Sequence, residues 1–365
     1  MSSERVPLVD LKAQFRAIEP EIRAAIDRVL ERQSFIIGPE TRAFEEEFAA
    51  FSGAAEAVAV SNGTTAIELV LWALGIGPGD EVITTAWTFW ATAEAILRLG
   101  ATPVFVDVRG DDWTLDPERV AAAITSRTKA ILPVHIFGHP ADVPAFLDGV
   151  PVIEDAAQAH GGSYHGRPVG SDGVAATFSF YPGKNLGAYG DAGAVITNDA
   201  DLAARVRALR DHGRSTKYEH PFAGTNARSS ELQCAILRVK LPHLTGWTEE
   251  RRRLAALYEE RLRGLGLRFQ ATQPWAHHAR HLFVIRHPER DGLKAHLAEE
   301  GIEAGIHYPI PVHRQPGLKG RDWRAAGGLE TTEALAREVL SLPLYPELGD
   351  DGVERVCRTI EQALR

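Results

Sequence analysis

Hydrophobic residues recur with two different spacings in the first two hundred residues. In residues 17–30 and 66–74 they return every three or four positions, which predicts helices; the second begins after the cap-forming Ser61 and Asn62 and ends at Gly75. Six shorter segments rich in valine, isoleucine or phenylalanine predict strands: 81–85, 102–108, 129–137, 151–156, 176–181 and 193–198. Four of these are nearly continuous apolar runs, as in strands covered on both faces. The pattern predicts an α/β domain with a largely parallel central sheet.

The pattern changes near residue 200, where longer helical segments follow one another. Helices are predicted over 202–213, 230–244 and 248–265, and we expect the last, which is highly charged, to link two domains. The remaining segments predict a small α+β domain. It contains a strand over 281–286, helices over 292–301 and 353–365, and a mixed stretch over 302–310. We therefore divide the chain into a large α/β domain, residues 1–245, and a small C-terminal α+β domain, residues 246–365.

The composition limits the kinds of partner that the protein can have. With 365 residues, 44% of them hydrophobic, the chain can bury a substantial core. Its net charge of −9 argues against a nucleic-acid partner, which requires a basic face, but allows a local basic pocket for an anionic substrate. Cys234 and Cys357 are too few for a disulfide framework or a four-cysteine metal site. The opening MSSERVPLVDLKAQF has no apolar signal core and no run is long enough to span a membrane, so we expect a soluble, cytoplasmic protein without membrane partners.

Residues 61–65, Ser-Asn-Gly-Thr-Thr, stand directly before a predicted helix. The free N–H groups and the positive dipole end of a helix N-terminus attract anions, and glycine lets an anion approach the backbone closely. Threonine hydroxyls add further donors. The same residues also cap ordinary helices, so the segment alone does not distinguish an anion site from a cap.

Two adjacent acids, Glu154 and Asp155, end the predicted strand 151–156. In α/β folds the carboxyl ends of the strands are where ligands bind. Because neighbouring residues of a strand point to opposite faces, only one of the two acids can face a site. A strand-end cap is the alternative role for either acid.

Lys184 lies in a glycine-containing turn after the predicted strand 176–181. A lysine held in a pocket can lose its charge and become a nucleophilic amine. It is not the lysine of a phosphate-binding P-loop, because Asn185 follows it and the GxxxxGK[ST] pattern is missing. An exposed lysine in a surface turn is the alternative.

Together, an anion-binding helix end, a strand-end carboxylate and a lysine match what pyridoxal phosphate requires. The lysine binds the cofactor as a Schiff base, the carboxylate pairs with the pyridine nitrogen, and the helix end holds the phosphate. A second group of polar residues, His277, His278 and His281, lacks a further ligand cluster, so we predict no metal and a polar surface or domain-interface role for these histidines.

Several motifs spread over nearly the whole chain resemble one family. They are VPLVDLKAQF, IIGPETRAFEEEFA, residues 61–96, IEDAAQAHG, FSFYPGKNLGAYGDAGAVITN, NARSSELQCAILRVKLPHL and GIHYPIPVH. These motifs are similar to those of the nucleotide-sugar aminotransferases of the DegT/DnrJ/StrS family, and the run around Lys184 is very specific. The resemblance implies a fold-type-I, aspartate aminotransferase-like architecture that uses pyridoxal 5'-phosphate. It also implies a homodimer with active sites shared at the dimer interface.

The resemblance assigns cofactor roles to particular positions. Lys184 matches the lysine that binds the cofactor, Asp155 its pyridine-nitrogen partner, and Gln158 the residue beside its phenolic oxygen. Three residues match phosphate contacts: Gly63, Thr64 and Ser179. Asn226 matches a phosphate contact that the second subunit donates. Phe89 matches the ring that stacks on the pyridine, with Trp87 and Trp90 as flanking alternatives, since a one-residue slip reverses the face of a strand.

The resemblance also implies two substrates, L-glutamate as amino donor and a nucleotide diphosphate keto-sugar as acceptor. Arg214, Lys217 and Tyr218 precede Asn226 and are candidates for diphosphate contact. The candidates for the sugar pocket are His160, Tyr181, His307 and Tyr308. Surface or packing roles are the alternative for each of these residues. One departure stands out, because Ser229 and Ser230 replace a leucine and an aspartate that the family often has before Glu231.

The chain looks most like the 3-aminotransferases that act on dTDP-3-keto-6-deoxyhexoses in deoxyaminosugar biosynthesis. Enzymes acting on 4-keto sugars share the same core, because a few pocket residues set which carbon is aminated. A sugar lyase of this kind would replace the lysine by histidine or add an iron–sulfur cluster, and Lys184 with two cysteines argues against both. A non-catalytic, cofactor-binding sensor and a related aminotransferase for a cyclitol or aromatic precursor are the remaining alternatives.

Overall fold

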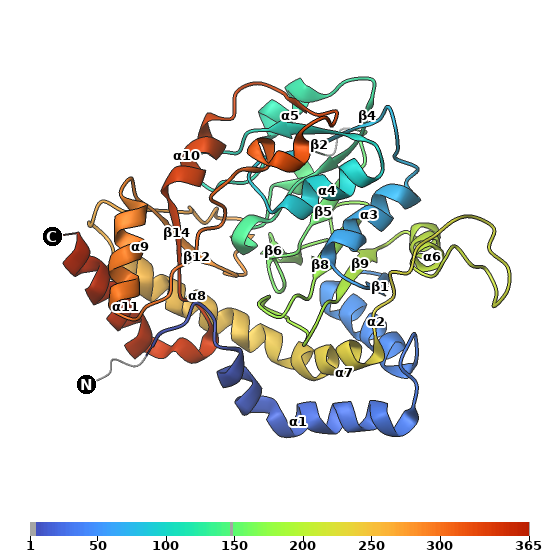
Figure 1. The fold of residues 1–365 in the computed structure, drawn as a ribbon, viewed down its shortest axis with the longest axis horizontal. Helices are drawn as coiled ribbons and strands as arrows, with labels where there is room; N and C mark the ends of the chain where they lie inside the picture. Colours follow the sequence, from blue (N-terminus) through green and yellow to red (C-terminus); the bar gives the residue numbers. More distant parts are fainter. Residues whose placement is uncertain (1–4, 147–148, 365) are drawn as a thin grey trace.

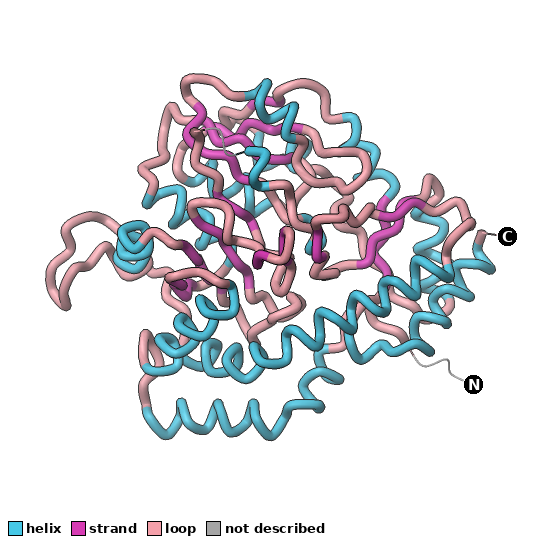
Figure 2. Tube along the Cα trace, turned by 180° about the vertical axis from the view of Figure 1, so that it is seen from behind, coloured by secondary structure: helices cyan, strands magenta, loops and turns pink. Residues whose placement is uncertain are grey.

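The computed structural model describes residues 5–146 and 149–364. A central β-sheet lies between layers of helices, and the long helix α8 (Leu244–Arg261) leads from this layered part to a smaller group that contains α9 (Arg290–Glu299) and α11 (Gly349–Ala363) (Figure 1). The long loop between α6 (Ala200–Leu209) and α7 (Glu231–Lys240) extends away from the rest of the molecule in both views (Figures 1 and 2).

The central sheet consists of two four-stranded parts, β13–β3–β2–β4 and β5–β8–β9–β1, joined by parallel bridges from Ile131 to Val152 and from Val134 to Asp155. Its strands are β1 (Glu56–Val60), β2 (Glu81–Thr85), β3 (Thr102–Val106), β4 (Thr128–Leu132), β5 (Ile153–Asp155), β8 (Ala175–Ser179), β9 (Gly193–Thr197) and β13 (Arg324–Ala325). Strand β9 runs antiparallel to both of its neighbours, and the other pairings are parallel. The predicted largely parallel sheet is therefore confirmed.

All six strands predicted from the sequence occur in this sheet, as β2, β3, β4, β5, β8 and β9. The edge strand β1 was missed, because its sequence EAVAV alternates valine with alanine, which has a weak preference for strands. Strand β13 was also missed. It has two residues and comes from the last part of the chain, which the sequence assigned to the small domain.

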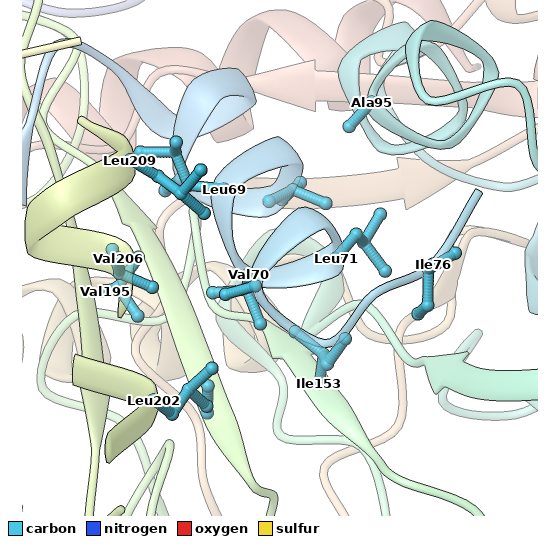
Figure 3. Close-up of a cluster of buried hydrophobic side chains, with 14 of the residues drawn as sticks. Leu69, Val70, Leu71, Ile76, Ala95, Ile153, Val195, Leu202, Val206 and Leu209 are labelled. Carbon is cyan, nitrogen blue, oxygen red and sulfur yellow. The ribbon is translucent and has the colours of Figure 1, made fainter. Parts of the chain in front are cut away.

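Helices cover both faces of the sheet. Because side chains alternate along a strand, one strand contributes residues to the helix–sheet packing on both faces. Val58 and Val60 of β1 pack with α3 (Gly63–Ala73) and α6, whereas Ala57 and Ala59 pack on the other face with the aromatic side chains of α2 (Pro39–Ser52) and with α7. Figure 3 shows side chains of α3, α6, β5 and β9 meeting in the first of these clusters. The other helices of the layered part are α1 (Leu11–Arg32), α4 (Trp90–Arg98) and α5 (Pro117–Ala123).

The smaller part of the molecule contains an antiparallel sheet, β10 (Arg268–Phe269), β12 (Phe283–Arg286) and β14 (Val339–Leu342), which packs with α8, α9 and α11. Helix α10 (Glu330–Glu338) precedes β14, and a further small sheet is formed by β6 (Ser163–Tyr164), β7 (Arg167–Pro168) and β11 (Ala276–His277). Within residues 5–146 and 149–364, no helix combines the length and apolarity needed to cross a membrane.

The division at residue 245 stays a prediction, and several segments cross it, among them β11, which pairs with β6. Val6, from the N-terminal segment, pairs with Ile302 and packs in the core of the smaller part. In the opposite direction, β13 pairs with β3, and Leu318 and Leu329 pack in a cluster with residues of the central sheet.

The start of α2 depends on a side chain that is remote in sequence. Its first residues lack a side-chain cap of their own, and the buried carboxylate of Glu231 accepts hydrogen bonds from the backbone N–H groups of Gly38 (2.7 Å), Glu40 (2.9 Å) and Thr41 (2.8 Å). Gly38 is required here, because a Cβ at this position would lie 2.5 Å from a Glu231 oxygen. Directly before Glu231, Ser230 caps α7 by accepting from the N–H of Gln233, so the serine that departs from the family pattern keeps a cap.

Replacing Glu231 by alanine should lower the free energy of unfolding by about 3 kcal/mol, because three N–H groups would lose their acceptor inside the protein. Glu46→Ala on the exposed face of α2 is the matched control and should change it by less than about 0.5 kcal/mol. Urea unfolding at one fixed protein concentration measures both. Equal effects of the two substitutions would contradict the role assigned to Glu231.

Candidate active site

A cavity of about 780 Å³ lies at the carboxyl ends of the central strands, a size typical of ligand pockets. Most of the residues predicted for the cofactor and the sugar line it. They are Gly63, Thr64, Phe89, Asp155, Gln158, Ser179, Tyr181, Lys184, His307 and Tyr308. The fold therefore brings together, from distant parts of the sequence, the lysine, the strand-end acid and the start of α3.

The start of α3 forms one end of the cavity. Asn62 caps this helix by accepting a hydrogen bond from the N–H of Thr65 (2.8 Å), which leaves the N–H groups of Gly63 and Thr64 free of that side chain. Gly63 lies so close to the end of β8 that a Cβ would be 2.7 Å from Cβ of Ser179. This close approach places a helix N-terminus and a serine hydroxyl at one point, which is an arrangement that binds an anion.

The two adjacent acids have separate roles, as the alternation of a strand predicts. Asp155 faces the cavity, where its carboxylate accepts from the hydroxyl of Thr92 (2.8 Å) and the N–H of Ala157 (3.2 Å). Burial raises the pKa of Asp155 above its ordinary value, and the Thr92 hydrogen bond is the largest opposing effect. A cation placed against this buried carboxylate would favour its ionised form.

Glu154 points to the other side of β5 and is a structural residue. Its carboxylate lies 2.9 Å from Nε2 of His135 and accepts from the N–H groups of Gly170 and Gly173, both at 2.8 Å. Burial raises the pKa of Glu154, but the contact with His135 and the backbone donors outweigh burial and lower it on balance. Glu154 thus stabilises the loop before β8. Of the two acids, only Asp155 is available to a ligand.

Lys184 lies in the turn that follows β8, where its N–H donates to the carbonyl of Tyr181 (2.8 Å). The turn is closed by Gly187, whose Cβ would come within 2.3 Å of the carbonyl oxygen of Pro182. Burial lowers the pKa of Lys184 to about 8, and the negative charge of Asp155 acts in the opposite direction. A lysine with this pKa is partly unprotonated near neutral pH and can act as a nucleophile or as a base.

Of the three aromatic residues considered for stacking, only Phe89 lines the cavity. Its side chain is 57% exposed, and its ring lies 5.8 Å from that of Tyr308. Trp87 is buried against Phe137, and Trp90 packs beside Gly317, where a Cβ would be 2.7 Å from the indole. Trp87 is therefore a core residue, and Trp90 is a partly buried residue that packs against the core of the large part of the molecule.

Gln158 and Tyr308 form a hydrogen-bonded pair on the cavity wall. Gln158 donates from Nε2 to the hydroxyl of Tyr308 (2.9 Å) and accepts at Oε1 from the N–H of Phe137 (2.6 Å). Phe137 has a left-handed backbone conformation, with φ of 59°, that directs its N–H toward this glutamine. The amide orientation of Gln158 is thereby fixed by contacts on both sides.

The predicted sugar-pocket residue His160 does not lie on the cavity wall. Its ring packs between Phe178 (5.3 Å between centroids) and Phe180 (5.5 Å), beside a separate hollow of about 110 Å³. Burial, followed by the charge of Lys184, lowers the pKa of His160 to about 3. The chain turns after Gln158, so this nearby histidine points into the core, and the prediction that it lines a sugar pocket is corrected to a packing role.

The four predicted residues of the α6–α7 loop do not reach the cavity of their own chain. Tyr218 is 81% exposed, and Nζ of Lys217 lies 5.2 Å from the centre of its ring. Arg214 forms an ion pair with Asp211 (2.5 Å), and Asn226 accepts from Nε of Arg228 (3.0 Å). The loop between α6 and α7 extends away from the molecule (Figure 2), and Asn226 lies at its base, where it pairs with Asp211.

Of the cavity residues that were not recognised in the sequence, Thr92 contacts Asp155 and His281 lies near Lys184. Thr92 lies one helical turn after Phe89, and that spacing was a signal for its contact with Asp155. His281 was grouped with His277 and His278 as a polar surface or interface residue, but it lines the cavity near Lys184. In the part of the chain that the structure describes, no three His, Cys, Asp or Glu residues are grouped so that they could hold a metal ion.

In the cofactor-free protein, an amine-specific reagent should modify Lys184 with a midpoint near pH 8, compared with about 10.4 for an ordinary lysine. Asp155→Asn should move this midpoint below that of the wild type, because the negative charge that favours the ammonium form is lost. Mass spectrometry of the modified peptide across a pH series measures the midpoint. Asp191→Asn, an exposed acid on the same cavity, is the control, and a rise of the midpoint in Asp155→Asn would contradict the assignment.

Known proteins are similar to this chain over nearly its full length. A model of the DegT/DnrJ/EryC1/StrS aminotransferase family matches residues 16–361. A dTDP-3-amino-3,4,6-trideoxy-alpha-D-glucose transaminase of Streptomyces venezuelae is 46% identical over 364 residues, which are 98% of this chain and 96% of the relative. The erythromycin biosynthesis sensory transduction protein EryC1 of Saccharopolyspora erythraea is 48% identical over 362 residues, 98% and 99% of the two chains.

The fold comparison agrees with the sequence comparison. The crystal structure of Streptomyces venezuelae DesV in complex with ketimine intermediate superposes with a TM-score of 0.96 at 47% sequence identity, and covers 99% of both chains. The predicted fold class is confirmed by this match. Because the family model spans most of the chain and the relatives align over nearly its full length, the protein belongs to the DegT/DnrJ/EryC1/StrS aminotransferase family.

Proposed function

We propose that the protein transfers an amino group from L-glutamate to a nucleotide-linked keto-sugar, with a dTDP-3-keto-6-deoxyhexose as the acceptor of first choice. The observation that carries this proposal is the arrangement of Lys184, Asp155 and the start of α3 around one cavity. Transaminases of this family depend on pyridoxal phosphate. The name of the Streptomyces venezuelae relative supports amination at the 3-position.

The residues of the cavity fit pyridoxal phosphate at its phosphate, its pyridine nitrogen and its ring face. The start of α3 with Gly63, Thr64 and Ser179 offers donors to the phosphate, in a cradle that a side chain on Gly63 would fill. Asp155 is a buried acceptor for a protonated pyridine nitrogen, and Phe89 offers a ring face for stacking. When bound, the cofactor supplies an electron sink that makes the proton on the Cα atom of an amino acid removable.

The protein's own contribution to the chemistry is proton transfer and positioning. The ε-amine of Lys184 has a pKa of about 8, so near neutral pH it can take up a proton from Cα of the donor and give it back elsewhere. Asp155 stays ionised when a cation lies against it, and Thr92 keeps its carboxylate in place. Gln158 and Tyr308 hold each other at the cavity wall, where they would orient polar groups of the ligands.

The diphosphate of the acceptor needs cations, and the two arginines that line the cavity are already engaged, Arg98 with Glu68 and Arg251 with the carbonyl of Leu344. We propose a homodimer in which the α6–α7 loop serves the cavity of the second copy. The support is the loop itself, which extends away from the molecule (Figure 1) with Tyr218 81% exposed, while Arg214, Lys217, Tyr218 and Asn226 are not among the residues that line the cavity. We place this dimer in the cytoplasm, which agrees with its two free cysteines, Cys234 and Cys357.

Two alternatives are tested by experiment. A 4-keto acceptor would use the same lysine and acid, and a panel of 3-keto and 4-keto nucleotide sugars separates the two regiochemistries. A non-catalytic sensor agrees with the printed name of the Saccharopolyspora erythraea relative. Retention of Asp155 beside Lys184 at the cavity favours catalysis, because an acid at the pyridine nitrogen serves the electron sink of the reaction and is not needed to attach the cofactor.

Purified protein with pyridoxal phosphate should show a visible absorbance band of the covalently bound cofactor, and L-glutamate should convert it to the pyridoxamine form. Lys184→Ala should lose the band and lower the rate of this conversion by about 1,000-fold. Lys294→Ala, an exposed lysine of α9, is the matched control and should behave as the wild type. A band that ignores every amino donor would favour the sensor.

Lys217→Ala should raise KM for the nucleotide sugar by about tenfold and leave the conversion with L-glutamate unchanged, because the side chain is assigned to the diphosphate. If the loop serves the partner's cavity, mixing this variant with Lys184→Ala should form dimers with one intact site. At a sugar concentration below KM, the mixture should then recover up to about one quarter of the wild-type rate. No recovery on mixing, with dimers present, would place the loop on its own cavity.

A further inference from the structure

Lys240, in α7, is a fully buried cation that contacts neutral oxygens and an aromatic ring. Its Nζ donates to Oε1 of Gln14 (2.9 Å) and to the carbonyl of Gly187 (2.8 Å). The centre of the Tyr189 ring lies 4.3 Å from the same Nζ. Two hydrogen bonds and one cation–π contact match the three N–H bonds of an ammonium group.

A charge in this place is unfavourable unless something depends on it. In the part of the chain that the structure describes, no carboxylate forms an ion pair with Lys240. Burial lowers the pKa of Lys240 to about 8, and the negative charge of Glu347 opposes this only in part. A methionine would fill a similar space without the cost of removing an ammonium group from water. The directed donors of Lys240, and not its packing, therefore explain why a lysine stands here.

One of these donors holds the turn that carries Lys184. The two ends of this turn meet, because the N–H of Ala188 donates to the carbonyl of Phe180 (2.8 Å). Inside it, Gly187 lies so close to Pro182 that a Cβ would be 2.3 Å from the carbonyl oxygen of that proline. Because this contact leaves no free space, a displacement of Gly187 would also move the backbone that leads into Lys184.

A second side chain of α7 holds the same turn. Oε1 of Gln233 accepts from the N–H of Tyr189 (2.8 Å). Gln233 precedes Lys240 by seven residues, which places both side chains on one face of the helix, two turns apart. Helix α7 thus contacts the returning half of the turn at two points, the carbonyl of Gly187 and the N–H of Tyr189.

We propose that Lys240 is a positioning residue that determines the place of Lys184 through the carbonyl of Gly187. Lys240 is not among the residues that line the cavity, so it acts through the backbone and not by contact with a ligand. A reacting group that is misplaced by about 1 Å can lower a rate by about 100-fold. The inference rests on the proposed function, since it concerns the lysine of that reaction.

The hydrogen bond to Gln14 gives Lys240 a separate contact that serves the packing of α1. Helices α1 and α7 lie side by side, and Ile18 of α1 packs with Ile236 of α7 (Figure 1). Loss of the Gln14 contact alone would weaken the attachment of α1 and leave the carbonyl of Gly187 bonded to Lys240. The two contacts can therefore be removed separately.

Three substitutions separate the two contacts. Lys240→Met keeps a long side chain but removes every donor, whereas Lys240→Arg keeps a positive charge with N–H donors. Gln14→Ala is the matched control, because it removes the contact with α1 and keeps the contact with the turn. Lys240→Met and Gln14→Ala should both lower the midpoint of urea unfolding, so stability alone does not distinguish the two contacts.

The first measurement uses cofactor-free protein and needs no turnover. Burial is the cause of the low pKa of Lys184, so a displaced turn that admits water should raise the pH midpoint for its modification. We expect a rise of about one unit in Lys240→Met, at least partial recovery in Lys240→Arg, and the wild-type midpoint in Gln14→Ala. A wild-type midpoint in Lys240→Met, or an equal rise in Gln14→Ala, would overturn the proposal.

The second measurement follows a single conversion of the bound cofactor by L-glutamate. In Lys240→Met the maximal rate should fall by about 10- to 100-fold, while the half-saturating glutamate concentration changes by less than about twofold, because the amine is misplaced and the donor site is not. Lys240→Arg should recover part of the rate, and Gln14→Ala should stay within about threefold of the wild type. An unchanged maximal rate in Lys240→Met, or a loss that saturating glutamate restores, contradicts a positioning role.

If Lys240→Met does not fold, Lys240→Gln takes its place. The amide of that glutamine ends about one bond short of Nζ, so it does not reach the carbonyl of Gly187 but leaves a polar group in the buried space. The same rise of the Lys184 midpoint and the same fall of the maximal rate are expected. Wild-type values of both in Lys240→Gln would overturn the proposal.

These results distinguish the inference from the proposed function. Failure of every nucleotide sugar, with the expected rise of the Lys184 midpoint in Lys240→Met, would overturn the proposed acceptor and support the role of Lys240. Transfer to a keto-sugar with an unchanged midpoint in Lys240→Met would overturn the role of Lys240 and leave the proposed function supported.

Discussion

The structure depends on keeping an amine and a carboxylate buried around the same cavity, with no ion pair to either one among residues 5–146 and 149–364. Burial alone disfavours both charged forms, which is why the pKa of Lys184 falls and that of Asp155 rises. The surrounding elements offset this cost only in part, through one threonine hydroxyl and one backbone N–H at Asp155. A ligand that supplies an aldehyde to the amine and a cation to the carboxylate completes the site.

Much of this arrangement could be predicted from the sequence, because it follows from local patterns. Six apolar segments became six strands of the sheet, and the alternation of a strand correctly separated Glu154 from Asp155. The short strand β13 and the alanine-containing strand β1 have weak local signals, and their places are determined by neighbours remote in sequence. Tertiary pairing is not visible in a short segment.

The side chains around Lys184 show the same limit. His160 lies two residues after Gln158 in the sequence, yet a turn directs it between two phenylalanines of the core. His281 belongs to a group of histidines that resembles a polar surface, and only packing against the turn of Lys184 reveals its place. The roles carried over from the family remain predictions, and the structure adds where each residue lies.

The crossing segments between the two parts of the molecule have a consequence for how ligands enter. The chain passes between the parts at the N-terminal segment of Val6, at α8 and at the segment that carries β13, and the first and last of these are held by backbone pairing. A hinge works when a few residues absorb the whole rotation, and these tethers, together with the pairing of β11 and β6, oppose such a swing. We therefore expect the width of the cavity to stay nearly constant. Selection among bulky ligands then depends on the shape of the entrance and not on closure of one part over the other.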